Sequence, residues 1–255
     1  RIYQSEKQLK KLLIDLHSHI LPGIDDGART LDIALEMAQQ AVTCGVSHMV
    51  CTPHIHMGYF DNSQSSIEAA FHSFNEHVKR ESIPLSLSFA AEVRVNELIP
   101  VWHKKGELPF LGTYDGKNVL LLEMPHSHIP QGIDVLIKWL LRNNIQPLIA
   151  HPERNRELIA ENHKFNWLQR QGCLFQATAG AFVGRFGDKV EEFAFRLLEE
   201  RAFHVVASDT HDLVRRPNDM KAAYEVIASY DYKYAKKTFL DIPGVMTALG
   251  RKHAS

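Results

Sequence analysis

The chain has 255 residues, with 29 Lys and Arg against 30 Asp and Glu, a formal net charge of -1 and 45% hydrophobic residues. This length is routine for one α/β barrel domain and buries enough surface to fold without disulfides. The balanced charge excludes a large basic surface for nucleic acid, and no apolar run approaches the roughly 20 residues of a membrane-spanning helix. Three cysteines without C-x-x-C spacing indicate reduced residues in a cytoplasmic protein.

Short aliphatic runs alternate with longer helical patterns along the chain. In chain order, the predicted strands are Leu12–Leu16, Ser47–Cys51, Leu85–Ala90, Val119–Glu123, Pro147–Ala150, Cys173–Ala177 and His204–Ala207. The predicted helices are Leu31–Val42, capped by Thr30 and ended by Gly45, then Ser66–Lys79, Ile133–Asn143, Arg156–Gln171, Lys189–Glu200 and Met220–Ser229. Alternation of this kind predicts a parallel sheet, and seven units favour a TIM-like barrel or near-barrel over an open sheet. We expect a single domain over 1–255 with a helical tail over about 226–255, of which Asp231–Ser255 has no strand and packs as terminal helix outside the barrel.

Histidine is unusually frequent, with 15 residues, and its placement is informative. Metal-binding side chains follow six of the seven predicted strands, namely His17, His19, Asp25 and Asp26, then His54 in a Thr-Pro-His turn, Glu92, Glu123, His151, Asp209 and His211. The carboxyl ends of parallel strands meet at one rim of a barrel, where active sites are built. A buried carboxylate there is costly unless a cation or hydrogen bonds meet it. The sequence therefore predicts a metal centre at this rim.

The predicted ligands are imidazoles and carboxylates without thiolate, a donor set that suits Mn, Fe or Zn in a catalytic site. Their number exceeds the needs of one ion, so two or three divalent ions that share a carboxylate are expected. Arg154 and Arg216 each follow a ligand-bearing segment. A guanidinium fork matches the oxygens of a phosphoryl group, which makes both arginines candidate catalytic residues. The pattern therefore indicates phosphate-ester hydrolysis, and the lack of any C-x5-R sequence excludes a phosphocysteine mechanism.

Aromatic residues near the rim are candidates for walls around a flat substrate ring. Tyr59 and Phe60 follow His54, while Phe182 and Phe186 lie in a glycine-containing loop after the sixth strand. We take Tyr59, Phe182 and Phe186 as weak candidates for substrate binding, with plain core packing as the alternative. Three further histidines flank the ligand segments and are expected to be supporting or surface residues rather than ligands: His56, His126 and His128.

Several motifs together resemble a known family. The His-Ser-His after the first strand, the Thr-Pro-His turn, Glu92, His151 and the Asp-x-His pair resemble the PHP (polymerase and histidinol phosphatase) superfamily of metal-dependent phosphoesterases. More narrowly, DLHSHILPGIDDG at 15–27, AHPER at 150–154, FQATAG at 175–180 and ASDTH at 207–211 resemble the bacterial tyrosine-protein phosphatases of capsule and exopolysaccharide operons, the CpsB/YwqE type. The resemblance extends from about Leu13 to Ala223 and is specific, because four motifs occur in the right order.

This resemblance implies a trinuclear site in a distorted (β/α)7 barrel. One ion would take His17, His19, Glu92 and Asp209, a second would share Glu92 and take Glu123 and His151, and a third would take Asp26, His54 and His211. Many PHP proteins carry histidine where Asp26 stands, and the aspartate is typical of the tyrosine-phosphatase branch. The resemblance also implies that Arg154 and Arg216 clamp phosphate and that manganese is the usual metal. The implied partner is the phosphotyrosine tail of a bacterial autokinase that controls capsular and exopolysaccharide synthesis.

The hypothesis that follows is attack on phosphorus by a metal-activated hydroxide, with tyrosine as the leaving group. A histidinol-phosphate or other small-molecule phosphatase would use the same metals and remains an alternative. An amidohydrolase-type barrel shares the H-x-H start but lacks the Thr-Pro-His turn and the closing Asp-x-His. A metal-bound regulator without activity is the last alternative. Homo-oligomerisation stays open, with Leu31–Val42 and the C-terminal tail as available surfaces.

Overall fold

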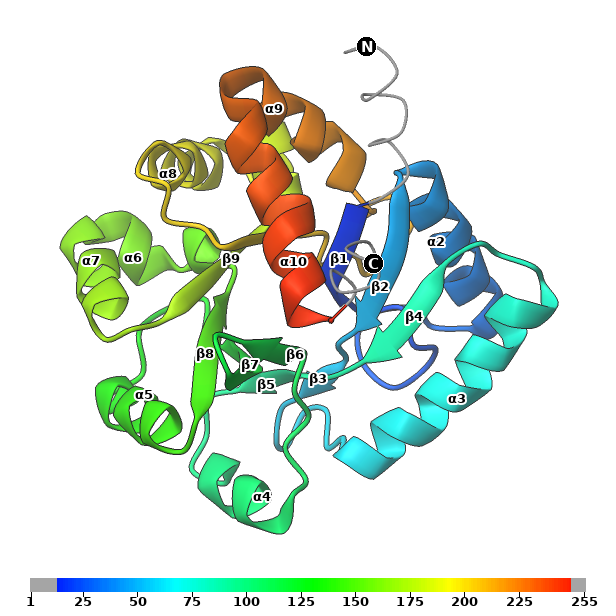
Figure 1. Ribbon diagram of the computed structural model, residues 1–255, viewed down its shortest axis with the longest axis horizontal. Coiled ribbons are helices and arrows are strands. Elements are labelled where there is room, and N and C mark those ends of the chain that lie inside the picture. The colour runs from blue at the N-terminus through cyan, green and yellow to red at the C-terminus, as the bar shows by residue number, and fades with distance from the viewer. Residues whose placement is uncertain (1–12, 249–255) are drawn as a thin grey trace.

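The computed structural model describes residues 13–248, in which helices surround a central set of strands (Figure 1). The strands are β1 Leu13–Ser18, β2 Val46–Cys51, β3 His54–Ile55, β4 Ser86–Phe89, β5 Glu92–Arg94, β6 Gly112–Tyr114, β7 Lys117–Glu123, β8 Ile145–Ala150, β9 Leu174–Thr178 and β10 Val205–Ala207. The α-helices are α2 Leu31–Thr43, α3 Gln64–Arg80, α4 Ile99–Lys105, α5 Ile133–Arg142, α6 Arg156–Ala160, α7 Asn162–Arg170, α8 Asp188–Glu199, α9 Met220–Lys236 and α10 Ile242–Met246. Two 3-10 turns, η1 Pro152–Arg154 and η2 Ala179–Val183, and a π-helix, η3 Lys237–Asp241, complete the elements of residues 13–248. Leu12 of the first predicted strand and both ends of the predicted domain lie outside the described residues.

The strands form two sheets. One has the order β1-β2-β4 and the other the order β10-β9-β8-β7-β5-β3, all parallel, with β6 antiparallel to β7. The sheets approach each other where the Asp209 N–H donates to the His17 carbonyl oxygen at 2.8 Å and the His19 N–H donates to the Thr210 carbonyl oxygen at 2.9 Å. The parallel α/β arrangement predicted from sequence is confirmed. Within residues 13–248 these pairings form two sheets and not one closed barrel.

Two of the predicted strands are each divided. The second continues beyond Cys51 as β3, and the third continues beyond Phe89 as β5. Pro53 supplies no N–H to a sheet ladder, and the Thr52 hydroxyl oxygen accepts from the Ser18 N–H at 3.0 Å. After the break, β3 and β5 pair with each other, with His54 opposite Glu92. His54 and Glu92 therefore belong to the larger sheet.

Helix boundaries follow the sequence signals closely. The Thr30 side chain accepts from the Ile33 N–H at 3.3 Å, as the predicted cap requires, and α2 buries one apolar face. The predicted helix Arg156–Gln171 is in fact two helices, because Glu161 between α6 and α7 has a non-helical backbone, with φ -130° and ψ 72°. The short α4, β3, β5 and β6 were not predicted, since two to seven residues are too few to show a period.

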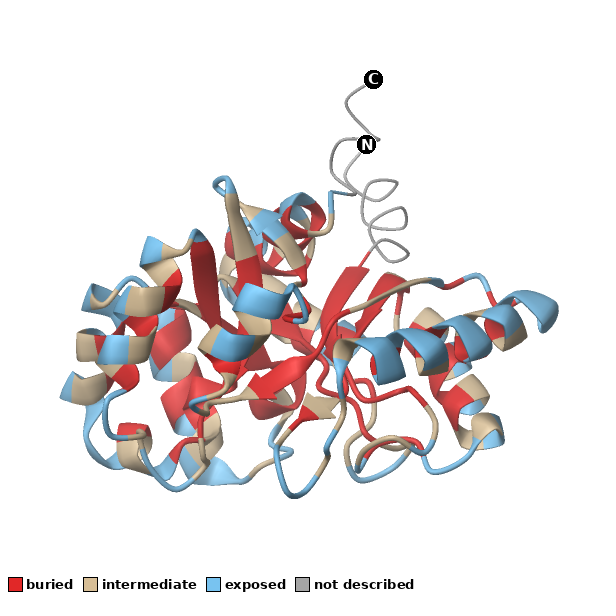
Figure 2. Ribbon diagram, turned by 90° about the horizontal axis from the view of Figure 1, so that it is seen from below, coloured by how far each residue is buried: buried red, intermediate tan, exposed pale blue. Residues whose placement is uncertain are grey.

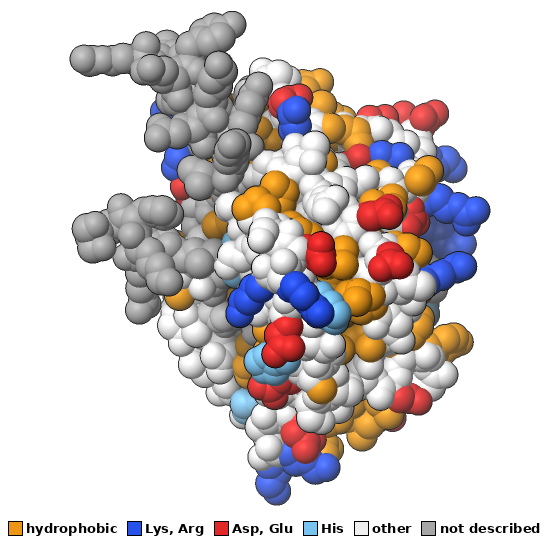
Figure 3. Space-filling model, turned by 90° about the vertical axis from the view of Figure 1, so that its right-hand side faces the viewer, with side chains coloured by type: hydrophobic (Ala, Val, Ile, Leu, Met, Phe, Trp, Pro, Cys, Tyr) orange, Lys and Arg blue, Asp and Glu red, His pale blue; other side chains and the backbone are white. Residues whose placement is uncertain are grey.

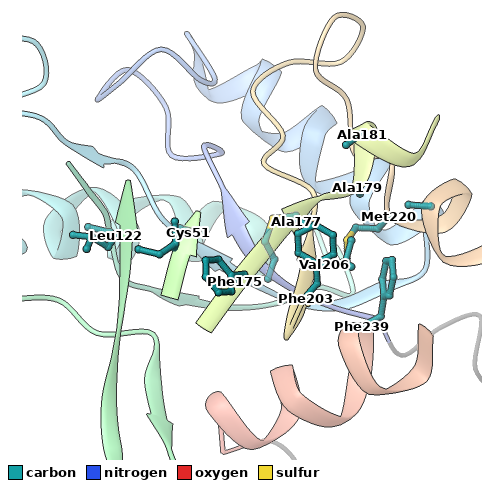
Figure 4. Close-up of a cluster of buried hydrophobic side chains, with 14 of the residues drawn as sticks. Cys51, Leu122, Phe175, Ala177, Ala179, Ala181, Phe203, Val206, Met220 and Phe239 are labelled. Atoms are coloured by element: carbon teal, nitrogen blue, oxygen red, sulfur yellow. The ribbon is translucent and has the colours of Figure 1, made fainter. Parts of the chain in front are cut away.

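The C-terminal segment belongs to the core. After a bend at Asp231, with φ -151° and ψ 95°, the chain continues through η3 into α10, which lies beside β1 in Figure 1. Phe239 is 0% exposed and lies in the same apolar cluster as Phe203, Val206 and Met220 (Figure 4). Ile242 and Met246 join a second cluster, between the two sheets, which includes Ile14, Leu16, Val119, Leu121 and Val205. The expectation that this tail packs outside the barrel is therefore wrong for the described part, because its apolar residues fill the space between the sheets.

One glycine reflects this close packing. A Cβ at Gly112 in β6 would lie 1.8 Å from the Met246 carbonyl oxygen, and its φ of 142° favours glycine as well. The end of α10 therefore rests directly on the backbone of β6. A side chain at position 112 would separate the two segments.

We expect Phe239→Ala to lower the free energy of unfolding by about 3–5 kcal/mol, because the substitution leaves a cavity among fully buried neighbours. Val245, in the adjacent α10, is 53% exposed, and Val245→Ala should change the free energy of unfolding by about 0.5 kcal/mol or less. Urea unfolding of both variants measures the difference. Equal stabilities would show that the segment is peripheral to the core.

The helices bury their inner faces and expose their outer ones, while the strands are mostly buried (Figure 2). On the face at the right of Figure 1, acidic, basic and apolar side chains are interspersed (Figure 3). Among the described residues, none of the helices has the length and apolar character needed to cross a membrane.

Candidate metal centre

All nine predicted ligands lie in groups whose donor atoms approach within 4.8 Å of one another. They lie in β1 or the segment after it, at the end of β7, and after β8 and β10, while His54 and Glu92 begin β3 and β5, which follow β2 and β4. The groups are His17, His19, Glu92 and Asp209, then His19, Asp26, His54 and His211, then Glu123, His126 and His151, and finally His54, Glu92 and Glu123. One group has the four residues expected for the first ion, another adds His19 to those expected for the third ion, and Glu123 and His151 are grouped with His126 rather than with Glu92.

Glu92 and Asp209 hold the centre of the site. His17 Nε2 lies 3.2 Å from Glu92 Oε2 and 3.3 Å from Asp209 Oδ1. His19 Nε2 lies 3.3 Å from the same glutamate oxygen and 3.2 Å from the same aspartate oxygen. His151 Nε2 reaches the other oxygen of Glu92 at 2.8 Å. Both oxygens of Glu92 therefore face imidazole nitrogens, and Glu92 would be among the residues that hold bound ions.

Hydrogen bonds on the outer ring nitrogens direct the inner ones toward the site. His17 Nδ1 donates to Gln176 Oε1 at 2.8 Å, and His19 Nδ1 donates to Asp25 Oδ2 at 2.7 Å. His211 Nδ1 likewise donates to the Asp209 carbonyl oxygen at 2.9 Å. In each neutral ring the lone pair then lies on Nε2, which is the arrangement that a metal-binding histidine needs.

Asp25 is placed by a tight turn. A Cβ at Gly27 would lie 1.9 Å from the His19 carbonyl oxygen, so only glycine allows the turn to pack on β1. The Gly27 N–H donates to Asp25 Oδ1 at 3.0 Å, and the His54 N–H donates to Asp25 Oδ2 at 3.2 Å. The neighbouring Asp26 points to the opening of the site, with Oδ1 3.4 Å from His54 Nε2 and 3.3 Å from His211 Nε2.

Two of the predicted ligands have a left-handed backbone, which non-glycine residues rarely adopt. His151 has φ 35° and Asp209 has φ 51°. The His151 N–H donates to the Gln176 carbonyl oxygen at 2.8 Å, and the Asp209 N–H donates to the His17 carbonyl oxygen at 2.8 Å. Such backbone strain is concentrated at functional sites, where the surrounding structure maintains it.

Unpaired buried polar atoms show that the predicted ligands fit a group of cations. Among the described residues, several buried donor and acceptor atoms that face the site make no hydrogen bond: His54 Nδ1, Glu92 Oε2, Glu123 Oε2, His126 Nε2, Asp209 Oδ1 and His211 Nε2. Buried polar atoms are almost always paired, and leaving one unpaired costs on the order of 1–3 kcal/mol. All six belong to imidazoles or carboxylates, which are ligands for divalent metal ions.

The pKa shifts reflect the same crowding of charge. Burial raises the pKa of Glu92, but the charges of His17 and His54 outweigh burial and hold this pKa well below its usual range. Burial lowers the pKa of His54, and the Glu92 charge more than reverses this, raising it to about 10. Burial and then the Glu92 charge raise the pKa of Glu123 to about 7. Protons and cations therefore compete for this site, and metal binding must release protons.

The two predicted arginines meet at Asp209. Arg154 Nη1 and Arg216 Nη2 each donate to Asp209 Oδ2 at 2.6 Å, on the oxygen opposite the one that faces the imidazoles. The Arg154 guanidinium lies 4.5 Å above the centre of the Phe186 ring. Arg216 Nε is buried and makes no hydrogen bond within residues 13–248. Two cationic forks thus lie beside the metal-binding groups with unused donors, an arrangement suited to a bound phosphate.

The predicted aromatic residues differ in exposure and in their contacts. Tyr59 is 78% exposed and stacks on His56 with ring centres 4.5 Å apart, so it remains a candidate for ring binding. Phe186 lies under Arg154 and also remains a candidate. Phe182 is 2% exposed and packs edge-on against Phe195 and Phe203. A role for Phe182 in substrate contact is therefore wrong, because the η2 turn directs this ring into the core.

Three residues support the site: sequence reasoning assigned no role to Gln176 and Arg94, and it placed Asp25 among the metal-binding side chains. Asp25 and Gln176 orient His19 and His17, and their positions within the quoted motifs were the available signal. Arg94 Nη1 lies 3.1 Å from Glu123 Oε1 and donates to the Met124 carbonyl oxygen at 3.0 Å. This contact leaves Glu123 Oε2 to face the site. Arg94 is two residues after Glu92 on the same short strand, a spacing that offered a weak signal.

Glu153 is a buried carboxyl next to the site. Its Oε1 accepts from the Thr178 N–H at 2.8 Å, and burial raises the pKa of Glu153 to about 7. The folded chain therefore holds a proton that the unfolded chain releases near pH 4.3, so this contribution to stability is complete below that pH and is lost as pH rises through about 7.

For the metal-free protein we expect Glu153→Gln to remove this pH dependence. The variant should match the native chain near pH 5 and exceed its free energy of unfolding by about 2 kcal/mol near pH 8. Urea unfolding at the two pH values measures the difference. A variant whose stability follows that of the native chain at both pH values would contradict a neutral, buried Glu153.

Comparisons with known proteins agree with this geometry. The family model for capsular polysaccharide synthesis, CpsB/CapC, matches residues 13–247. The tyrosine-protein phosphatase YwqE of Bacillus subtilis (strain 168) is 35% identical over 204 residues, which cover 80% of this chain and 79% of YwqE. The tyrosine-protein phosphatase CpsB of Streptococcus pneumoniae is 31% identical over 238 residues, covering 91% of this chain and 96% of CpsB.

A solved structure is similar over nearly the whole chain. It comes from the crystal structures of YwqE from Bacillus subtilis and CpsB from Streptococcus pneumoniae, described as unique metal-dependent tyrosine phosphatases. It has a TM-score of 0.81 and 30% identity and covers 92% of each chain. The likeness thus extends to the α/β fold that carries the clustered ligands.

Proposed function

Since the chain belongs to the CpsB/CapC family of capsular polysaccharide synthesis, we propose that it is a metal-dependent tyrosine-protein phosphatase. The observation that carries this proposal is that the predicted metal ligands and the two arginines meet at Asp209. One oxygen of this carboxylate faces His17 and His19, and the other accepts from Arg154 and Arg216. A cation site and an anion site therefore share one residue, an arrangement suited to metal-assisted hydrolysis of a phosphate monoester.

Two or three divalent ions, with Mn²⁺ the expected metal and Fe or Zn as alternatives, would be held by the nine predicted ligands in the partition given above. When bound, the ions supply Lewis acidity, which activates water for attack on phosphorus and neutralises the phosphate oxygens. Asp25 and Gln176 keep His19 and His17 in the required orientation, and Arg94 does the same for Glu123. These supports preorganise the ligands before any ion enters.

The arginines bind the phosphoryl group. Arg154 is only 12% exposed and is backed by Phe186, so its guanidinium is partly shielded from water and its charge acts strongly at short range. Arg216 approaches from the loop after His211. Together they hold the phosphate oxygens while tyrosine leaves. Because tyrosine has a pKa near 10, its departure needs little help from a general acid.

The substrate we propose is phosphotyrosine on the tail of a bacterial autokinase that controls capsular and exopolysaccharide synthesis. A protein-borne substrate suits the apolar side chains that stand free near the site, since Tyr59 is 78% and Val214 is 77% exposed. A cytoplasmic location is part of this proposal and agrees with the free cysteines Cys44, Cys51 and Cys173. We also propose that residues 1–255 form a single phosphatase domain and that its two sheets are one distorted (β/α)7 barrel.

The test is phosphate release by metal-stripped protein after addition of Mn²⁺, Zn²⁺ or Mg²⁺. We expect Mn²⁺ to restore hydrolysis of a phosphotyrosine peptide, with kcat/KM at least about ten-fold above that for histidinol phosphate. The free thiols take no part, so alkylation should leave the restored activity intact. Hydrolysis of histidinol phosphate alone would retain the metal centre but overturn the assignment to phosphotyrosine.

A further inference from the structure

His126 has different surroundings from the other histidines that flank the ligand segments. Its ring lies flat against His151, with ring centres 5.0 Å apart and planes 9° apart. One of its ring nitrogens lies within 4.8 Å of the donor atoms of Glu123 and His151. His126 Nε2 is buried and makes no hydrogen bond among the described residues. By contrast, His128 is exposed, and its Nδ1 is hydrogen-bonded to Ser127 Oγ at 2.7 Å.

The backbone of His126 is held by the loop that follows His151. The Arg156 N–H donates to the His126 carbonyl oxygen at 2.8 Å. Asn155 Nδ2 donates to the carbonyl oxygens of Pro125, at 2.8 Å, and His128, at 3.1 Å. The loops after β7 and β8 are thereby joined on both sides of His126. The ring is therefore preorganised beside His151.

A buried imidazole nitrogen without a partner is costly, and here Glu123 Oε2, in the same group, is also unpaired. One cation between them would satisfy both atoms. We propose that His126 is a further metal ligand, at the position formed by Glu92, Glu123 and His151, and that it shifts this position toward Zn²⁺ relative to Mn²⁺. The inference rests on the proposed metal centre but not on the identity of the phosphorylated substrate.

The selectivity follows from the donor atoms. Without His126, this position offers two carboxylates and one imidazole, a set rich in the oxygen donors that suit Mn²⁺. His126 makes nitrogen and oxygen donors equal in number, and imidazole favours Zn²⁺. His126 therefore gives this position the same balance of nitrogen and oxygen donors as the group of His17, His19, Glu92 and Asp209.

The experiment compares His126→Phe with the matched control His128→Phe in the metal-free, full-length chain. Phenylalanine keeps a flat ring against His151 but has no nitrogen donor. Calorimetric titration with Zn²⁺ and with Mn²⁺ gives the number of ions bound and their affinities. We expect His126→Phe to weaken one Zn²⁺ site by at least about ten-fold and to reduce the ratio of Zn²⁺ to Mn²⁺ affinity, while His128→Phe binds like the native chain.

Native Zn²⁺ affinity and an unchanged affinity ratio in His126→Phe would overturn the inference. A second measurement uses the native chain and does not depend on folding of the variant. In long-range ¹H–¹⁵N spectra, the Nε2 resonance of His126 should shift on Zn²⁺ addition, and an unmoved resonance at saturating Zn²⁺ would also overturn it. Because neither measurement uses a phosphorylated substrate, absence of phosphatase activity would count against the proposed function alone.

Discussion

Replacing Glu92 by glutamine is expected to lower kcat/KM for a phosphotyrosine peptide by at least about 10³-fold, even at saturating Mn²⁺. The carboxylate contacts imidazole nitrogens on every side, at 3.2 Å from His17, 3.3 Å from His19, 3.1 Å from His54 and 2.8 Å from His151. A neutral amide offers one oxygen instead of two and removes the charge that holds neighbouring cations together. At least one ion should be lost, and with it several kcal/mol of transition-state stabilisation.

Metal analysis and steady-state kinetics on the same sample measure this loss. Glu97→Gln is the matched control, because Glu97 is exposed and lies five residues further along the chain. It should keep native metal content and rate. Full activity in Glu92→Gln with fewer bound ions would show that the bridging position is dispensable for catalysis.

The second large effect concerns the phosphate-binding arginines. Arg154→Ala and Arg216→Ala should each reduce kcat/KM by about 10²- to 10³-fold, since each removes a charged donor from the developing phosphoryl charge. The fold-reduction of kcat/KM in the double variant should be smaller than the product of the two single fold-reductions. Both side chains contact the same oxygen of Asp209, so their effects are not independent. Lysine should rescue poorly, since an ammonium group lacks the planar fork.

Neighbouring arginines provide the controls for this series. Arg156 and Arg215 are exposed, and their alanine variants should retain native kinetics. All variants need metal contents equal to the native chain, so that loss of ions is distinguished from loss of phosphate binding. Native kcat/KM in Arg154→Ala under these conditions would remove Arg154 from the mechanism.

The ligand positions could be predicted because parallel strands concentrate their carboxyl ends, and ligand residues such as Glu123 and His151 stand at those ends in the sequence. The division of two strands could not, since β3 has only two residues and β5 three. The tail was misjudged for a different reason. Phe239 and Ile242 lie in an irregular helix whose π-turn disrupts the usual 3.6-residue period, so no clear apolar face was visible.

The supporting residues show a further limit of sequence reasoning. His126 and His128 are two residues apart in similar surroundings, yet one is half-buried beside His151 and the other is exposed. The difference depends on the hydrogen bonds from Asn155, a residue in another loop. Arg94 likewise gains its role from Glu123 on the neighbouring strand. Contacts between loops distant in sequence leave no periodic trace in either loop.

The contact between β1 and the segment after β10 determines when the site becomes complete during protein synthesis. The Ser208 N–H donates to Asp15 Oδ1 across 193 residues, and Asp209 next to it meets His17. A nascent chain on the ribosome thus exposes His17 and His19 long before Asp209 and His211 emerge. Closing so long a loop is slow and entropically costly. The full set of predicted ligands therefore exists only after the segment that carries Asp209 and His211 has been synthesised, and stable loading with ions is expected to follow that step.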